Sequence, residues 1–352
     1  MRRVAVVAPP SNKGVSSPAH VSGVSQVHVA VLGTGHIGRK HLETLRALDL
    51  VHPVAIPMHP ERVAQMQAAG HSTARDLDHA RRLGAPLCII ATDTSRHVQD
   101  GVAALERGFD VLVEKPLAAD LQGARALSLR ASALGRRLFV GCVLRFSESL
   151  NTFRQLLETV GCLHMVRIEC QSYLPDWRPG RPYRDSYSAR ADEGGVLRDL
   201  IHEIDYAGWL FGWPRSVQAR IQNLGRLGIE AEELAELTWE LPEGGLVSMT
   251  LDYLTRPSRR RLRASGEQGT LEWDGIAGTV AVALAGEEPQ LLRSNQTRDE
   301  LFLAQDRAVI EACGGRSDPR LATADDGVRA LAVCEAAQRA NASRREEAVE
   351  YQ

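Results

Sequence analysis

Short apolar runs alternate with helical patterns through the first half of the chain. Runs of strand length occupy residues 27–32, 51–56, 87–91 and 111–113. Each of these runs is followed by a segment whose apolar positions recur at helical spacing. The first such segment ends at residue 48, and the others cover 61–69, 98–107 and 120–134. Strands that alternate with helices in this way predict a parallel, doubly wound sheet.

The pattern changes after Phe146. Helical segments at 150–157 and 195–211 enclose a strand at 163–171, and the tail at 299–341 is helical. Between 218 and 273, turn residues such as Pro242-Glu243-Gly244-Gly245 separate several extended runs. This half therefore predicts a second α/β unit built on an open, mostly antiparallel sheet.

Length, charge and cysteine spacing narrow the functional classes. The 352 residues suit two domains, and a formal net charge of −2 gives no attraction to nucleic acid or an anionic membrane. No stretch is as long as a membrane span, and the apolar run at 4–8 is shorter than a secretory signal needs. The six cysteines form no C-x-x-C pair, so we expect no metal site and no disulfide. A cytoplasmic location is the expectation.

A glycine motif follows the first predicted strand and opens the first helix. The segment Gly33-Thr34-Gly35-His36-Ile37-Gly38 has the spacing G-x-G-x-x-G. Such glycines permit a tight turn and a close approach of the backbone to a pyrophosphate at the helix N-terminus. We therefore predict a dinucleotide-binding Rossmann domain at 27–145 and a substrate-binding and oligomerisation α/β domain at 146–352. Residues 1–26 are expected to form a flexible extension.

The end of the second strand bears on the choice of cofactor. The acid that would bind the ribose 2′-hydroxyl of NAD is missing, and Pro57 occupies its place. His59 and Arg62 lie just beyond, and Arg62 could pair with the 2′-phosphate of NADP. The sequence slightly favours NADP. Two alternatives stay open: Arg62 is only a solvated residue in the first turn of the helix, or Glu61 binds the ribose of NAD.

Two segments carry candidate chemistry. Glu114-Lys115-Pro116 follows a strand at the carboxyl edge of the sheet, where a lysine can stabilise the alkoxide that forms as hydride leaves. On the predicted helix at 195–211, Asp199, His202 and Asp205 share one face. A carboxylate beside an imidazole suits a general base, although an acidic helix start with a buried histidine would give the same pattern.

These motifs occur in a familiar order. The glycine motif, the segment 91–97, Glu114-Lys115-Pro116, the segment 140–146 and the Gly-Gly…Asp…His…Asp helix together resemble the Gfo/Idh/MocA oxidoreductase family. The resemblance covers residues 27 to about 340. It implies that Lys115 and His202 flank the reacting carbon with Asp199 in support. It also implies that the nicotinamide is lined by Ala91, Thr92, Thr94, His97 and the Glu114-Lys115 pair.

The sequence departs from the family pattern at the catalytic helix. The family usually places the aspartate and the histidine four residues apart, but Asp199 and His202 are three apart. This departure puts the role of Asp199 in question more than that of His202.

An aromatic, arginine-rich segment at 173–190 has no counterpart in the motifs above. Its aromatic side chains could stack on a sugar ring, and Arg178, Arg181 and Arg184 could bind phosphate or carboxylate. An oligomer interface favours the same residue types. We expect the substrate pocket to be formed by Arg145, Tyr173, Trp177, Arg178, Tyr187 and Asp205.

The sequence thus predicts an NAD(P)-dependent oxidoreductase that transfers hydride between nicotinamide and a ring hydroxyl or ketone. The expected substrate is a sugar, amino sugar, nucleotide sugar or cyclitol. A non-catalytic, nucleotide-sensing regulator of the same fold is one alternative, and a reductase of an imine or unsaturated substrate is another. The strand region 246–253, with no helix predicted over its outer face, and the family resemblance imply a homodimer or homotetramer.

Overall fold

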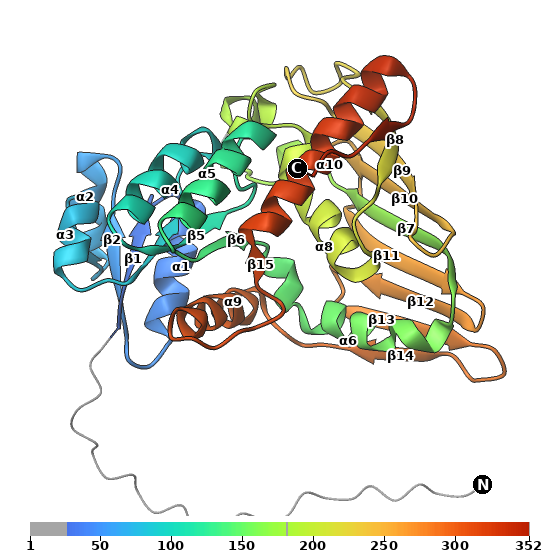
Figure 1. Ribbon diagram of the computed structural model, residues 1–352, viewed down its shortest axis with the longest axis horizontal. Coiled ribbons are helices and arrows are strands. Elements are labelled where there is room, and N and C mark those ends of the chain that lie inside the picture. Colours follow the sequence, from blue (N-terminus) through green and yellow to red (C-terminus); the bar gives the residue numbers. More distant parts are fainter. Residues whose placement is uncertain (1–26, 181, 352) are drawn as a thin grey trace, which may run out of the picture.

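The computed structural model describes residues 27–180 and 182–351. The extension expected at 1–26, and Arg181 of the arginine-rich segment, lie outside the described residues. Two sheets organise the chain, and Figure 1 shows the first with its helices on the left and the second, larger sheet on the right. Among the described residues, no helix is both long and apolar enough to cross a bilayer.

The first sheet is the predicted parallel sheet. Its seven strands have the order β15-β6-β5-β4-β1-β2-β3. The parallel strands are β1 (Val27–Leu32), β2 (Val51–Ile56), β3 (Ser72–Thr73), β4 (Leu87–Ile90), β5 (Asp110–Glu114) and β6 (Leu138–Gly141). The helices between them are α1 (His36–Arg46), α2 (Pro60–Ala68), α3 (Leu77–Arg82), α4 (His97–Glu106) and α5 (Leu121–Ala133). All residues of β4 are buried, as expected for a central strand covered on both faces.

The second sheet is mostly antiparallel, as predicted. Its nine strands have the order β14-β13-β12-β11-β7-β10-β9-β8-β16, and β7 with β10 is a parallel pair. The strands are β7 (Leu163–Gln171), β8 (Ser216–Gln222), β9 (Leu234–Glu240), β10 (Leu246–Asp252), β11 (Arg259–Gly266), β12 (Gly269–Asp274), β13 (Thr279–Leu284), β14 (Gln290–Arg293) and β16 (Glu347–Ala348). Buried and more exposed positions alternate along β9, so the apolar residues of this strand pack toward the helices.

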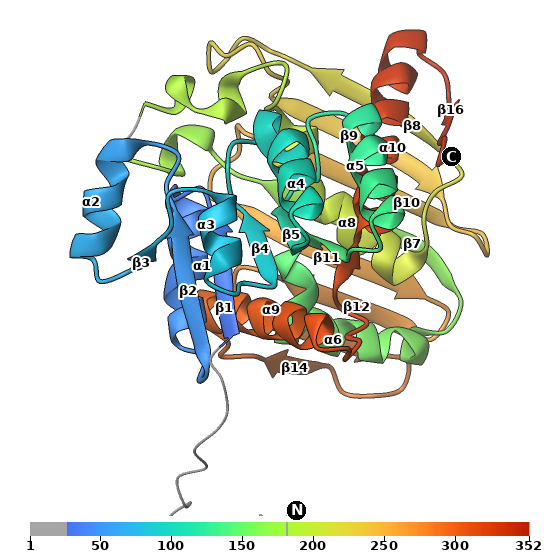
Figure 2. The same ribbon diagram turned by 60° about the vertical axis from the view of Figure 1, so that its left-hand side comes forward.

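The C-terminal tail differs from the single helical stretch expected at 299–341. It forms α9 (Arg298–Cys313) and α10 (Ala324–Ser343), separated by the two-residue strand β15 (Ala322–Thr323). β15 pairs antiparallel with β6, which adds a C-terminal strand to the first sheet. α9 packs against α1, and α10 packs against both α5 and β8 (Figures 1 and 2). The tail therefore contacts both halves of the protein.

The helix expected at 195–211 is also interrupted. It forms a short α7 (Val196–Asp199) and a longer α8 (Ile201–Phe211), and Leu200 lies between them with φ −97° and ψ 26°. Asp199 and His202 therefore lie on different helices. The prediction that one continuous helix carries Asp199, His202 and Asp205 is therefore wrong for Asp199, whereas His202 and Asp205 do share α8.

Candidate active site

The glycine turn after β1 leaves open space at the N-terminus of α1. Gly33 has φ +93°, and a Cβ there would lie 2.6 Å from the carbonyl oxygen of Ala91. A Cβ on Gly38 would collide with the carbonyl oxygen of Gly33. Gly35, the N-cap of α1, differs because a Cβ there would meet nothing within 4 Å. The backbone packs tightly inside the turn and is open outside it, which fits a bound pyrophosphate.

Positive charge surrounds this opening. His36, the first residue of α1, is exposed, and burial together with Arg298, Arg178, Arg39 and Lys40 lowers its pKa. The first turn of α1 contains no acidic residue. Cations and a helix N-terminus both attract an anion, so the electrostatics agree with the geometry.

Thr34 in the glycine turn and two residues just after β2 are the next candidates for contact with the cofactor. Thr34 is buried and its hydroxyl has no hydrogen-bond partner among the described residues, which fits a position that a ligand atom completes. Arg62 donates from Nη1 to the carbonyl oxygen of Thr34 at 3.1 Å. His59, the N-cap of α2, is exposed and lies 3.9 Å from the carboxylate of Glu61. Arg62 therefore reaches the glycine turn, whereas His59 points into solvent.

The segment after β4 is held by buried polar contacts. The Thr92 hydroxyl donates to Asp100 at 2.8 Å, and the side chain of Thr94 is buried. The two ring nitrogens of His97 lie 2.8 Å from the carbonyl oxygen of Pro116 and 3.1 Å from that of Thr92. Burial lowers the pKa of His97. His97 thus joins the segment after β4 to the segment after β5.

Lys115 extends from the end of β5 toward the second half of the chain. Its Nζ donates to the backbone carbonyl oxygen of Asp199 at 2.7 Å. Glu114, the residue before it, is buried, and the Lys115–Pro116 peptide is cis. The ammonium therefore lies at the carboxyl edge of the parallel sheet, beside the start of α8.

His202 lies on the first turn of α8 and is half-buried. Its Nδ1 is buried and has no hydrogen-bond partner in the part of the chain that the structure describes. Burial, and then the positive charges of Lys115 and Arg260, lower its pKa well below the usual value. The imidazole is therefore neutral at pH 7 and available to accept a proton.

Asp199 contacts Lys115 and two tyrosines. Its carboxylate accepts a hydrogen bond from the phenol of Tyr253 at 2.7 Å. Burial and the same carboxylate raise the pKa of the Tyr187 phenol. We expected Asp199 to orient His202, but the break at Leu200 places its carboxylate on the tyrosines and its carbonyl on Lys115.

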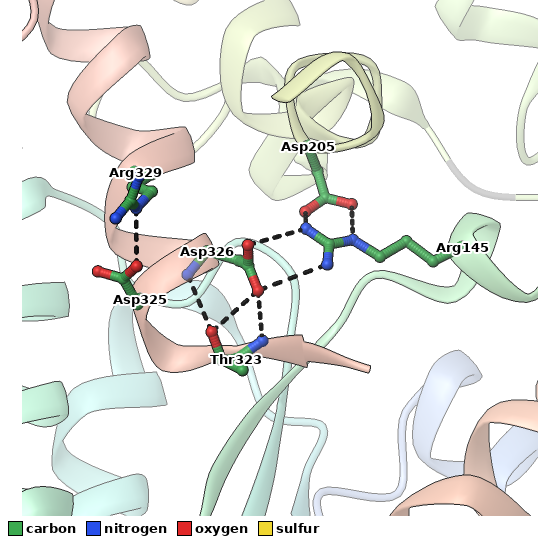
Figure 3. A network of polar contacts seen from close by, with 6 residues as sticks. All are labelled: Arg145, Asp205, Thr323, Asp325, Asp326 and Arg329. Carbon is green, nitrogen blue, oxygen red and sulfur yellow. Dashed lines mark hydrogen bonds and ion pairs between the residues drawn. The ribbon is translucent and has the colours of Figure 1, made fainter. Parts of the chain in front are cut away.

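Arg145 and Asp205 have each other as partners. The guanidinium of Arg145 forms two hydrogen bonds with Asp205 on α8, at 2.9 and 2.7 Å, and both side chains are 2% exposed. Asp326, at the start of α10, lies on the other side of the guanidinium at 3.2 Å (Figure 3). The Asp205 carboxylate thus remains paired inside the protein, although burial raises its pKa. We expected both residues to contact the substrate. Instead they form an internal ion pair that, with Asp326, joins the segment after β6, helix α8 and helix α10.

The aromatic, arginine-rich segment divides into packed and site-facing residues. Trp177 donates to the hydroxyl of Ser172 at 2.9 Å and packs edge-on against Tyr253. Arg256 stacks on the ring of Tyr173, 3.4 Å from its centroid. Arg184 donates to the carbonyl oxygen of Leu227 at 3.0 Å.

Among the described arginines of this segment, Arg178 lies near the cofactor turn and the Asp199 cluster. Its guanidinium lies 5.8 Å from the ring centroid of Tyr187, and its charge acts on His36 at the glycine turn. A positive charge therefore lies between the cofactor turn and the Asp199 cluster.

Three residues of the site escaped the sequence analysis. Tyr253 follows β10 inside an apolar run, so nothing marked its phenol as a partner of Asp199. Glu232 packs on Gly195 and accepts from the backbone N–H of Leu197 at 3.3 Å. The Gly194-Gly195 pair was the available signal for such close packing, but it does not name the partner. His41, which lies behind Lys115, carried no motif.

A separate cavity of about 400 Å³ lies at the opposite end of the first sheet. His28, His52, His71 and His79 line it, near the starts of β1 and β2 rather than their ends. In the described part of the chain, no three side chains of histidine, cysteine, aspartate or glutamate are arranged to hold a metal ion. The cavity is therefore neither a metal centre nor part of the glycine-turn site.

Comparisons with known proteins agree with this geometry. Residues 27–142 match the oxidoreductase family with an NAD-binding Rossmann fold, and residues 151–272 match the GFO/IDH/MocA C-terminal domain. A myo-inositol dehydrogenase, Hyg17 of Streptomyces leeuwenhoekii, is 28% identical over 90% of this chain and 97% of its own length. The rhizopine catabolism protein MocA of Rhizobium meliloti is 26% identical over 89% of this chain and 95% of its own length.

A solved structure extends the likeness to three dimensions. A levoglucosan dehydrogenase in complex with NADH and levoglucosan superposes with a TM-score of 0.82, covering 92% of this chain and all of that one. The sequence identity is 17%, so this likeness concerns the fold. Because both domain models match in order and full-length relatives align along both halves, the chain belongs to the Gfo/Idh/MocA family of nicotinamide-dependent oxidoreductases.

Proposed function

We propose that the protein catalyses reversible hydride transfer between a nicotinamide cofactor and a CH–OH group of a sugar or cyclitol. One observation carries the proposal. The Lys115 ammonium and the neutral His202 imidazole lie close enough for the lysine to lower the pKa of the histidine. Lys115 follows β5 at the same carboxyl edge of the sheet as the open glycine turn that follows β1. A cation and a base at one point are what the oxidation of an alcohol requires.

Residues of this chain have distinct tasks in the proposed reaction. The glycine turn and the N-terminus of α1 would hold the cofactor pyrophosphate, and a nicotinamide bound there would supply the hydride acceptor. His202 takes the proton of the substrate hydroxyl. Lys115 stabilises the negative charge that develops on the same oxygen.

Asp199 is a positioning residue in this scheme. Its carbonyl oxygen accepts from the Lys115 ammonium, and Tyr253 donates to its carboxylate. These contacts hold the lysine at the boundary between the two halves of the chain, where the substrate enters.

The cofactor preference is proposed as NADP. Pro57 leaves no carboxylate to bind a 2′-hydroxyl or repel a 2′-phosphate, and Arg62 already reaches the carbonyl oxygen of Thr34. An arginine beside the glycine turn fits a phosphate. The levoglucosan dehydrogenase with a similar fold binds NADH, so NAD is the alternative that a titration must test.

We propose a substrate that combines a polyol ring with a negatively charged group. Tyr187 and Arg178 face the site, and among the described residues no acidic side chain forms an ion pair with Arg178. The Hyg17 relative acts on myo-inositol, which supports a cyclitol or sugar ring. Tyr173 and Trp177 would support the wall of the substrate pocket without contacting the substrate. Arg145 and Asp205 are not proposed as substrate contacts, because they bind each other.

The second sheet also bears on how copies of the chain assemble. Exposed or half-exposed side chains alternate with buried ones along β7 of the second sheet, so one face is accessible to a second copy of the chain. We propose a homodimer or homotetramer built on this face, measured by light scattering, and a cytoplasmic enzyme, measured by cell fractionation.

A panel assay tests the function. The purified protein is mixed with NAD⁺ or NADP⁺ and cyclitols, aldoses, amino sugars and uronic acids, and reduced cofactor is followed at 340 nm. We expect turnover of at least one polyol, because the base and the cation are both in place. Tight NAD(P)H binding without oxidation of any alcohol would favour a nucleotide-sensing regulator. Reduction of imines but not of ketones would favour the other alternative.

A further inference from the structure

A buried imidazole joins three elements behind Lys115. His41 lies on α1, one turn beyond the glycine turn, and its side chain is fully buried. Its Nδ1 lies 2.8 Å from Oδ1 of Asp306 on α9, and its Nε2 lies 3.0 Å from Oε1 of Glu114 at the end of β5. The cofactor helix and α9 are thus connected to the strand end that carries the lysine.

The imidazole is a cation between two carboxylates. A neutral ring has one N–H, but both nitrogens of His41 face carboxylate oxygens, so both must carry a proton to donate. Burial by itself lowers the pKa of His41, but Asp306 and Glu114 raise it to about 10. Asp306 is fixed in turn, because the Thr44 hydroxyl donates to its other oxygen at 2.6 Å. The connection therefore persists through the pH range of ordinary assays.

The backbone is anchored on both sides of Lys115. Glu114 lies opposite Gly141 of β6, where a Cβ would lie 2.7 Å from its carboxylate oxygen, so a larger residue there would displace this side chain. On the other side, His97 bonds to the carbonyl oxygen of Pro116 at 2.8 Å. The residues directly before and after Lys115 are therefore both fixed by buried contacts.

We propose that His41 is a positioning residue for Lys115, fixing the β5 end by clamping Glu114 to Asp306. The inference rests on the proposed role of Lys115 in hydride transfer. A lysine side chain has many rotamers, so a fixed backbone origin is needed to keep its ammonium on the reacting oxygen. A displacement of about 1 Å in a catalytic group can cost roughly 100-fold in rate.

Two double variants that differ only at residue 41 test the proposal. His41→Gln with Asp306→Asn keeps an amide donor for Glu114, whereas His41→Leu with Asp306→Asn removes it. Both replace the α9 carboxylate with an amide, so neither leaves that charge buried without a partner. Thr44→Val removes one donor to Asp306 but leaves both contacts of His41, so it should lower kcat less than the Leu variant does.

Kinetics and chemical labelling give independent readouts. We expect the Leu variant to lose about 10- to 100-fold in kcat with KM and the NAD(P)H dissociation constant within about 3-fold of the Gln variant. Acylation of Lys115 by an amine reagent, followed by peptide mass spectrometry, should be at least about 5-fold faster in the Leu variant, because the ammonium leaves the Asp199 carbonyl more often. In a Lys115→Ala background the Leu and Gln variants should have equal kcat.

Equal labelling rates in the Leu and Gln variants would overturn the proposal, as would a kcat difference that persists without Lys115. If the Leu variant does not fold, Glu114→Ala removes the same contact from the other side and must accelerate Lys115 labelling. The labelling result does not depend on a known substrate. A failure of the proposed function, seen as no polyol turnover, is therefore distinguishable from a failure of this inference.

Discussion

Replacing Gly35 by alanine separates the packing of the glycine turn from its proposed role in binding the cofactor. A Cβ on Gly35 meets no atom within 4 Å, and its backbone is extended with a negative φ of −68°. The folded protein therefore accommodates the methyl group, with a stability change within about 1 kcal/mol. The same methyl group occupies the space where we place the pyrophosphate.

Gly38 is the matched control in the same turn. A Cβ there would collide with the carbonyl oxygen of Gly33, which is backbone and cannot rotate away. Overpacking of this kind costs about 1–3 kcal/mol. We therefore expect the melting temperature of Gly38→Ala to fall by roughly 2–10 °C.

The assay combines thermal melting with titration by NADH and NADPH, following energy transfer from tryptophan to the bound dihydronicotinamide. Gly35→Ala should melt like the wild type and bind the cofactor at least about 10-fold more weakly, a loss of about 1.4 kcal/mol. Wild-type affinity in Gly35→Ala would show that the open space is not the pyrophosphate site, and the reasoning from the turn would then be wrong.

Three further predictions concern other parts of the site. Asp205→Ala leaves the buried Arg145 guanidinium with Asp326 alone, so urea unfolding should show a loss of about 3–5 kcal/mol; a loss below about 1 kcal/mol would contradict the internal ion pair. Because burial, Lys115 and Arg260 lower the pKa of His202, the base is neutral above that pKa, and kcat/KM for alcohol oxidation should fall only below pH 6.5. An acidic limb above pH 7 would exclude His202 as the base. Arg62→Ala should weaken NADPH binding by about 10-fold and NADH binding by less than about 2-fold; equal losses for both cofactors would remove Arg62 as the phosphate contact.

Local patterns in the sequence were sufficient to predict the two sheets. Fully buried strands such as β4 read as continuous apolar runs, and the glycine turn marks the passage from β1 to α1. The strand β15 was missed because two residues carry no periodicity, and its pairing with β6 is set by contacts far apart in the chain. The break at Leu200 was missed because the residues around it suit a helix on both sides.

Partners across the fold could not be predicted. Arg145 and Asp205 each carry a charge that suits a ligand, and only the packing of α8 against the segment before α6 (Glu148–Leu156) shows that they bind each other. The polar His41 stands beside the buried Leu42 and Leu45 on α1, so an internal partner was foreseeable, but Asp306 lies on a distant helix. Motifs therefore indicate where chemistry occurs, whereas tertiary contacts decide which groups are free to perform it.

The most direct test of the account is the turnover number of Lys115→Ala and His202→Ala on a polyol that the wild-type protein oxidises. Each variant should still bind NAD(P)H and lose at least about 100-fold in kcat, because each removes one of the two groups that act on the substrate oxygen. Full turnover in either variant would contradict the proposed mechanism.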